Sequence, residues 1–192
     1  MSKGEHTRQA ILAAAVELLG QAGPDGFSAA ALAQAAGVSK ATLFHHFDGM
    51  DAIPLAAFEE IWLRALRQPG GAAAEAPALR PYLEALGEEV LTAAREQRAF
   101  FNAYFVFLTQ ALFKPALRER LAAGSGELQA ALSAELAARL PGLAPAETEA
   151  TAQLIAVALD GLGLHALALS GEPALRRAWA RLVDLLAPAE SS

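Results

Sequence analysis

The sequence predicts an all-α protein with about nine helices. Alanine and leucine dominate its 192 residues and β-branched residues are scarce, which favours helix along the whole chain. Hydrophobic residues make up 54% of the chain and charged residues only 19%, so a sizeable core, or a core and an oligomer interface, has to be accommodated. Apolar residues recur at three- and four-residue spacing in successive segments, and this spacing is typical of amphipathic helices.

The composition also excludes several kinds of protein. The chain has no cysteine, which excludes disulfides and thiolate metal sites. The longest uncharged run, residues 99–113, is 15 residues long and too short to span a bilayer. The first residues lack the uninterrupted apolar stretch of a signal peptide. We therefore expect a soluble, cytoplasmic protein that does not act at a membrane.

The first three predicted helices form a compact module. Residues 6–22 form the first helix, and two short helices follow within residues 27–47. Ser28 and Ser39 stand at the N-cap positions of these two helices, and Gly37 lies in the turn between them. The shared core is predicted to contain Leu12, Val16, Leu19, Phe27, Leu32, Val38, Leu43 and Phe47.

The third helix of this module is too short to be stable alone, and its outward face indicates a function. Lys40, Ala41, Phe44 and His45 are predicted to point away from the core, on the side opposite Leu43. A short, capped second helix that presents small, basic and aromatic side chains is what a reader of the DNA major groove needs.

The charge of this end is unusual for a DNA-binding surface. The whole chain has a net charge of −6, and residues 1–50 are not basic either. Their fixed charges are Lys3, Arg8 and Lys40 against Glu5, Glu17, Asp25 and Asp48. Because phosphate neutralisation supplies much of the affinity for DNA, binding has to depend on a few well-placed charges and on two copies of the chain.

The remainder of the chain is predicted to be helical with clear breaks. Residues 51–67 form a linking helix, with Asp51 as its N-cap and Pro54 as its third residue, where proline loses no backbone hydrogen bond. Residues 68–74 break this helix and mark the boundary between a domain over 1–50 with its linking helix and a larger domain over 68–192. The further helices are predicted over 77–97 (or from Pro81), 98–113, 117–121, 128–140 and 145–169, with a last one through 175–186 and an interruption at Gly124-Ser125-Gly126.

Residues 27–47, with the helix before them, resemble the DNA-binding region of the TetR family of transcriptional regulators. The residues that carry the resemblance are Leu32-Ala33, then Ala36-Gly37-Val38-Ser39-Lys40-Ala41-Thr42-Leu43-Phe44-His45-His46-Phe47. The resemblance is strong over residues 6–66, and beyond them it extends only to the overall helical architecture. The resemblance implies a homodimer joined through the last two long helices, and a pocket for a small-molecule effector in the larger domain. It also implies a repressor that the effector releases from a palindromic, double-stranded DNA operator.

The resemblance assigns DNA-binding residues to this sequence, and the residues of the later helices suggest a pocket and a dimer interface. The DNA-binding positions are Ser28, Ser39, Lys40, Ala41, Thr42, Phe44, His45 and His46. The candidate ligand-pocket residues are Trp62, Phe101, Asn102, Tyr104, Phe105 and Thr109, with pocket and plain core packing about equally supported for the aromatic ones. The candidate dimer-interface residues are Gly161, His165, Leu169, Trp179 and Leu182.

Two departures from the family pattern concern the contacts to phosphate. Phe44 stands where the family usually has a tyrosine, whose hydroxyl binds phosphate. The segment Asp48-Gly49-Met50-Asp51 stands where the family usually has Lys-Ser/Asn-Lys-Glu. The sequence therefore predicts operator binding with little help from the DNA backbone and a shallow dependence on salt.

Two other functions were weighed against a repressor. A TetR-like ligand-binding or scaffolding protein with weakened DNA binding is favoured by the missing lysines. A helical enzyme has little support, because the sequence contains no nucleophile elbow, Walker loop or HExxH motif. His45 and His46 point about 100° apart on a helix, which disfavours a shared metal. We expect no enzyme activity, cofactor or metal.

Overall fold

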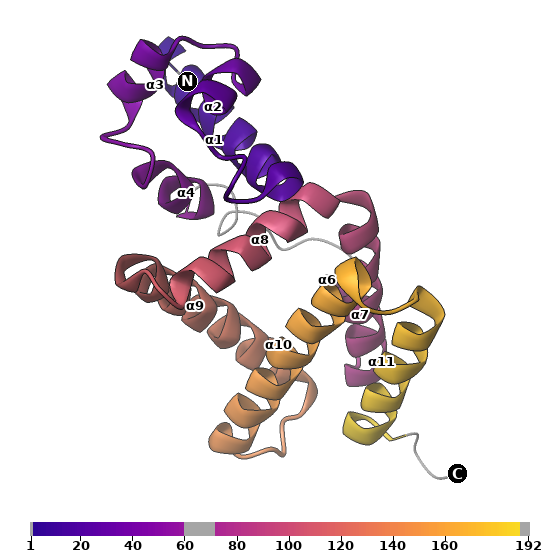
Figure 1. Cartoon of the computed structure of the whole chain (residues 1–192). Helices are drawn as coiled ribbons and strands as arrows, with labels where there is room; N and C mark the ends of the chain where they lie inside the picture. The colour runs from indigo at the N-terminus through magenta and orange to yellow at the C-terminus, as the bar shows by residue number, and fades with distance from the viewer. Residues whose placement is uncertain (1, 60–71, 189–192) are drawn as a thin grey trace. The chain divides into compact units, whose positions relative to one another are not determined.

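The computed structural model describes residues 2–59 and 72–188, and this part of the chain forms helices joined by short connections (Figure 1). The prediction of an all-α chain with about nine helices is confirmed. The helices are α1 (Lys3–Ala22), α2 (Ala29–Ala35), α3 (Lys40–His46), α4 (Ala52–Ala57), α6 (Ala72–Glu75), α7 (Leu79–Glu96), α8 (Arg98–Ala111), α9 (Pro115–Arg139), α10 (Pro145–Ala168) and α11 (Glu172–Leu186).

The chain divides into two compact units. Unit 1 consists of Met1–Gln68 and Arg98–Gly124, and unit 2 consists of Pro69–Gln97 and Ser125–Ser192. Unit 1 thus adds α8 and the first part of α9 to the DNA-binding module. Compactness and function are different properties, so the functional boundary at residue 68 stays a prediction.

The first helix begins earlier than the sequence predicted. α1 starts at Lys3 rather than at residue 6, because Ser2 and Glu5 form a capping box: each side chain bonds the other residue's backbone N–H. At the other end, the N–H of Gly23 donates to the carbonyl of Leu19 at 3.0 Å. The added turn places Lys3 and His6 on the first turns of α1.

The core of unit 1 is the one that the sequence predicted for the first three helices. Leu12, Leu32 and Leu43 are fully buried, and the other predicted core residues are buried or packed against the same cluster. α8 joins this core through Ala103 and Phe107. α8 packs on α1 and so extends the core that the sequence predicted for the first three helices.

α4 starts as predicted, with Asp51 at its N-cap position and Pro54 as its third residue. The Asp51 side chain makes no capping hydrogen bond, however, and accepts from the Nζ of Lys114 at 3.0 Å instead. The part of the linking helix from residue 60 onward, which includes Trp62, lies outside the described residues.

The predicted interruption at Gly124–Gly126 is wrong, because α9 runs through it as one helix of 25 residues. Each glycine costs about 1 kcal/mol in a helix interior. The flanking alanine and leucine residues favour helix, and Leu121 and Leu132 are buried on either side of the glycines. Tertiary packing therefore outweighs the local glycine signal here.

Unit 2 has its own core, to which α7, the second part of α9, α10 and α11 contribute. The indole Nε1 of Trp179 donates to the carbonyl of Leu83 at 2.8 Å. The guanidinium of Arg139 lies over the Tyr82 ring, 4.2 Å from its centre, and one of its nitrogens donates to the carbonyl of Ala76 at 2.7 Å. α7 begins at Leu79, between the two starts that the sequence suggested.

Candidate nucleic-acid interface

α2 and α3 are short helices with serine caps at both starts. The hydroxyl of Ser28 accepts from the N–H of Ala31 at 3.2 Å, and that of Ser39 accepts from the N–H of Thr42 at 3.0 Å. These bonds satisfy backbone donors that have no partner inside a helix. The predicted capping roles are confirmed, whereas contact of either serine with phosphate stays a prediction.

The turn between the two helices depends on a glycine. Gly37 has a φ of +66°, in the left-handed region where a side chain causes strain. The next residue, Val38, returns its N–H to the carbonyl of Ala33 at 2.9 Å and closes the end of α2. This turn sets α3 at its angle to α2 and so determines which side chains face outward.

The exposed side of α3 carries the residues that the sequence placed there. Lys40, Ala41, Phe44 and His45 are exposed, whereas Leu43 is fully buried on the other side. The two remaining candidates are half-buried at the edges. The Oγ1 of Thr42 lies 2.9 Å from the Oγ of Ser39, and the His46 ring lies edge-on to the His45 ring, with 5.4 Å between centres.

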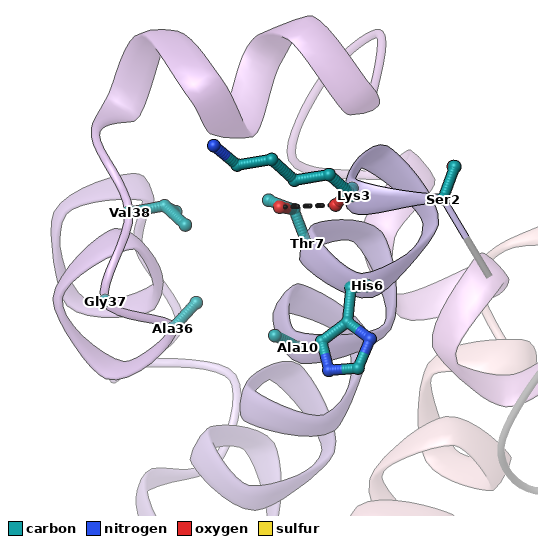
Figure 2. Close-up of a pocket in the computed structure, with 8 residues that line it drawn as sticks. All are labelled: Ser2, Lys3, His6, Thr7, Ala10, Ala36, Gly37 and Val38. Atoms are coloured by element: carbon teal, nitrogen blue, oxygen red, sulfur yellow. Dashed lines mark hydrogen bonds between the residues drawn. The ribbon is translucent and has the colours of Figure 1, made fainter.

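The first turns of α1 form a groove with the α2–α3 turn, which the sequence analysis did not foresee. It is open, has a volume of about 440 Å³, and is lined by Ser2, Lys3, His6, Thr7, Ala10, Ala36, Gly37 and Val38. Figure 2 shows Lys3 extending from α1 toward the side of the groove where Val38 lies. The serine–glutamate pattern of the capping box was the sequence signal that could have placed Lys3 and His6 on a helix.

Two further cations reach this end of unit 1. The guanidinium of Arg8 lies over the Phe47 ring, 5.0 Å from its centre, at the end of α3. Lys114, from the connection between α8 and α9, pairs with Asp51 just after α3. The 63 residues between these partners explain why no local pattern predicted the pair.

The ligand-pocket candidates lie on α8 with one change of role. Phe101, Tyr104 and Phe105 are half-buried. The amide of Asn102 donates to the carbonyl of Gly20 at 2.9 Å and so joins α8 to α1, while its part in a ligand pocket stays a prediction. Thr109 is exposed and its hydroxyl donates to a carbonyl of its own helix.

The sequence also extended α8 too far. The helix ends at Ala111, and Leu112 and Phe113 follow it with 70% and 84% of their surface exposed. These two residues therefore lie beyond the observed end of the helix that the sequence predicted over 98–113. Trp62, the remaining pocket candidate, lies outside the described residues, and the pocket stays a prediction.

The dimer-interface candidates divide into exposed and buried residues. His165 is exposed, Leu169 is 66% exposed, and Gly161 and Leu182 are half-buried. Trp179 is different: it is 7% exposed and belongs to the core of unit 2, where its indole hydrogen bond holds it. The sequence pattern did not separate these two roles, because both place apolar residues at helical spacing.

α10 has a composition that the sequence analysis underrated. Over 18 residues its mean hydropathy is 1.4, and 28% of that window is buried, so by length and composition alone it could cross a membrane. The longest uncharged run did not reveal α10, because a helical segment with one or two charged residues can still be apolar enough to cross a membrane. Much of its apolar surface is thus uncovered within one chain.

The fold and the exposed face of α3 define the class of protein: a helix-turn-helix DNA-binding regulator with a larger helical region. Residues 11–57 match the family model described as bacterial regulatory proteins, tetR family. Residues 79–188 match the model described as BetI-type transcriptional repressor, C-terminal. The chain belongs to the TetR family of transcriptional regulators, and its C-terminal region is of the BetI type.

Individual relatives agree with this assignment. The HTH-type transcriptional regulator BetI of Burkholderia mallei is 28% identical over 193 residues, which cover 96% of this chain and 95% of the relative. BetI of Paraburkholderia phymatum is 28% identical over 95% of this chain and 93% of the relative. The family and these relatives are transcriptional regulators rather than enzymes.

Solved structures have the same fold. A transcriptional regulator from Pseudomonas aeruginosa PAO1 is 27% identical, with a TM-score of 0.76 over 96% of this chain and 92% of that one. A regulator from Saccharomonospora viridis, solved in complex with choline, has a TM-score of 0.77 at 19% identity over 94% of this chain and 96% of that one.

Proposed function

We propose that this chain is a dimeric repressor that binds a palindromic DNA operator and leaves it when a small, largely apolar effector binds. The observation that carries the proposal is the outward face of α3, where Lys40, Ala41, Phe44 and His45 are exposed together on a helix anchored by the buried Leu43. Side chains of this size and type on a short recognition helix fit the major groove.

Dimer formation is supported by the uncovered apolar side of the last two long helices. Contiguous apolar patches on a soluble protein mark interaction sites, and a two-fold dimer would also match a palindromic operator. Large apolar side chains are exposed on α10 at Leu154 (50%), Val157 (59%) and Leu164 (40%), just after it at Leu169 (66%), and on α11 at Leu185 (63%). A second protomer explains the hydropathy of α10 without a membrane.

The charge distribution supports a modest number of phosphate contacts. The cations near the outward face of the module come from three places: the start of α1 with Lys3, α1 with Arg8, and α3 with Lys40. The nearby carboxylates of Asp48 and Asp51 oppose them, and Asp51 already holds Lys114. A dimer that neutralises fewer than about six phosphates would show a salt slope shallower than about −5.

The effector is proposed from the aromatic side chains of α8 and from the similarity of this chain to known regulators. α8 carries half-buried aromatic rings at Phe101, Tyr104 and Phe105, and aromatic faces attract organic cations as well as apolar groups. The C-terminal region is of the BetI type, and the regulator from Saccharomonospora viridis was solved with choline. Choline, a quaternary ammonium with three methyl groups, is therefore the first compound to test.

The DNA-binding part is tested by fluorescence anisotropy with the DNA that flanks the protein's own gene, over a series of salt concentrations. Replacing Lys40 by Ala removes one cation from each protomer of the proposed dimer, so it should weaken binding tenfold or more and make the salt slope shallower by about two. The matched control is Arg118→Ala, which removes one exposed cation on α9 and should change the Kd less than twofold. A wild-type chain that binds this DNA no better than random DNA would favour the alternative, a ligand-binding or scaffolding protein.

The dimer and the effector are tested on the same protein. Sedimentation equilibrium should give a dimer for the wild type and a monomer for Val157→Glu, whereas Ala122→Glu, which adds the same charge at an exposed position on α9, should stay dimeric. Choline added to the protein–DNA complex should lower the anisotropy and raise the melting temperature of the free protein. Unchanged DNA binding at millimolar choline would exclude choline as the effector, and a wild-type monomer would contradict the dimer.

A further inference from the structure

Phe44 is an apolar side chain on the face of α3 that is proposed to meet DNA. Its ring is 47% exposed in the free protein, although burying an aromatic side chain is normally favourable. Leu43, the residue before it, is fully buried and anchors the opposite side of the helix. The exposure of Phe44 is therefore imposed by its position on α3, where a polar residue would fit better unless a partner covers the ring.

Ala41 and Phe44 together form the centre of the outward face. Residues three apart lie on the same side of a helix, and both of these are exposed. Lys40 and His45 are also exposed and lie on either side of the pair. The centre of the face thus presents a methyl group and a phenyl ring, with the groups that can donate hydrogen bonds at its edges.

The hydroxyl of Thr42, the next residue after Ala41, already has a hydrogen-bond partner within the helix cap. Thr42 is half-buried, and its Oγ1 lies 2.9 Å from the Oγ of Ser39, which also caps α3. The middle of the face therefore offers the base edges apolar contact rather than hydrogen bonds. In the major groove the exposed apolar group is the C5-methyl of thymine, and alanine and phenylalanine are side chains that contact it.

We propose that Ala41 and Phe44 read thymine through its C5-methyl group in each half of the operator. This inference rests on the proposed function and specifies how the operator is recognised. Phe44 stands where the family usually has a tyrosine that binds phosphate, and in this chain the ring would serve base recognition instead. Lys40 and His45 supply the polar contacts on either side.

The test uses duplexes that the purified full-length protein selects from a random library over several rounds. Each thymine of the selected half-site is replaced in turn by deoxyuridine, which lacks only the methyl group. Loss of one buried methyl should raise the Kd about fourfold at the contacted positions. Replacing the same base pair by 5-methylcytosine paired with guanine should bind more tightly than cytosine paired with guanine, since the methyl group returns.

Variants assign the effect to the two residues. Phe44→Ala should reduce the thymine-to-uracil ratio of Kd values from about four to about one at the position that Phe44 contacts, while Phe44→Tyr, which keeps the ring, should preserve it. Ala41→Gly should remove the ratio at a different position. Circular dichroism checks that each variant is folded, and the surface position of both residues makes this the expected result.

Three results would overturn the inference. Deoxyuridine at every thymine could leave the wild-type Kd unchanged, or the methyl effect could persist in both Phe44→Ala and Ala41→Gly. Phe44→Ala could also weaken all duplexes equally, which would place the ring on the DNA backbone. In each of these cases the proposed function stands, because the wild type still binds its selected duplex. A library that yields no preferred duplex would refute the proposed function and this inference together.

Discussion

The crossing of α1 and α8 in unit 1 is predicted to tolerate only glycine at position 20. A Cβ added to Gly20 would lie 1.9 Å from the carbonyl oxygen of Ala99 and 2.4 Å from its carbonyl carbon. Both atoms are backbone, so no side-chain rotation relieves the clash. The two helices would have to separate by about 1.5 Å to restore an ordinary contact of 3.4 Å.

The cost of Gly20→Ala follows from three contributions. Overpacking a well-packed contact costs about 1–3 kcal/mol. Separation of the helices also breaks the hydrogen bond from Asn102 to the Gly20 carbonyl, which contributes about 1 kcal/mol. Alanine regains about 1 kcal/mol over glycine from helix propensity. We expect Gly20→Ala to lower the free energy of unfolding by about 1–3 kcal/mol.

The assay is urea unfolding followed by circular dichroism at one fixed protein concentration, because the stability of the proposed dimer would depend on concentration. The matched control is Gly126→Ala in α9, where an added Cβ meets nothing within 4 Å, and this variant should be about 1 kcal/mol more stable than the wild type. If the two units unfold in separate steps, Gly20→Ala should move one step only. A Gly20→Ala protein that is as stable as Gly126→Ala would refute the close contact.

Three further predictions concern unit 2. Gly87→Ala would bring a Cβ to 2.2 Å from the Nε1 of Trp179, so the indole should lose its hydrogen bond and the free energy of unfolding should fall by about 2 kcal/mol. The fluorescence of Trp179 should shift to the red, and unchanged fluorescence would contradict this packing. Burial raises the pKa of Tyr82 from 10.0 to about 12, so the free energy of unfolding should decline as the pH rises from 10 to 12. Tyr82→Phe should remove about 2 kcal/mol of that decline, measured from urea midpoints, and parallel pH profiles of the two proteins would exclude a raised pKa for Tyr82. The hydrogen bond from Arg176 lowers the pKa of Glu88 below 4.5, so this pair should stabilise the fold above pH 4.5 and lose its effect as the pH falls further. Because Glu88 is half-exposed, Glu88→Gln should flatten the acid side of the stability profile by only about 0.5 kcal/mol, and a steeper acid side would refute the pairing.

Local signals in the sequence were enough to predict α2 and α3. Serine caps, a glycine turn and apolar spacing act within a few residues, so Ser28, Gly37 and Ser39 could be placed without tertiary information. The same kind of reasoning failed at Gly124–Gly126. There the burial of leucines on both sides of the glycines keeps α9 continuous, and burial depends on the rest of the fold.

The candidate site shows the same division. The outward face of α3 follows from its helical period, since burial of Leu43 determines which residues face away. Lys114 beside Asp51, and Arg8 over Phe47, could not be predicted, because these pairs form only when distant segments pack together. Lys114 brings a cation from outside residues 1–50 to this end of unit 1, and Arg8, which was already counted there, is placed at the end of α3.

By itself, the sequence determined the helical class, the capped two-helix motif and the side chains that its second helix exposes, because all of these depend on interactions within one or two turns. Only the tertiary structure decided what the polar and apolar residues of the later helices do. It placed Asn102 on the α1 carbonyl of Gly20 and Trp179 in the core of unit 2. The physical reason is that a helical period shows which residues share a face, whereas the partner of that face is set by the packing of helices that are far apart in the chain.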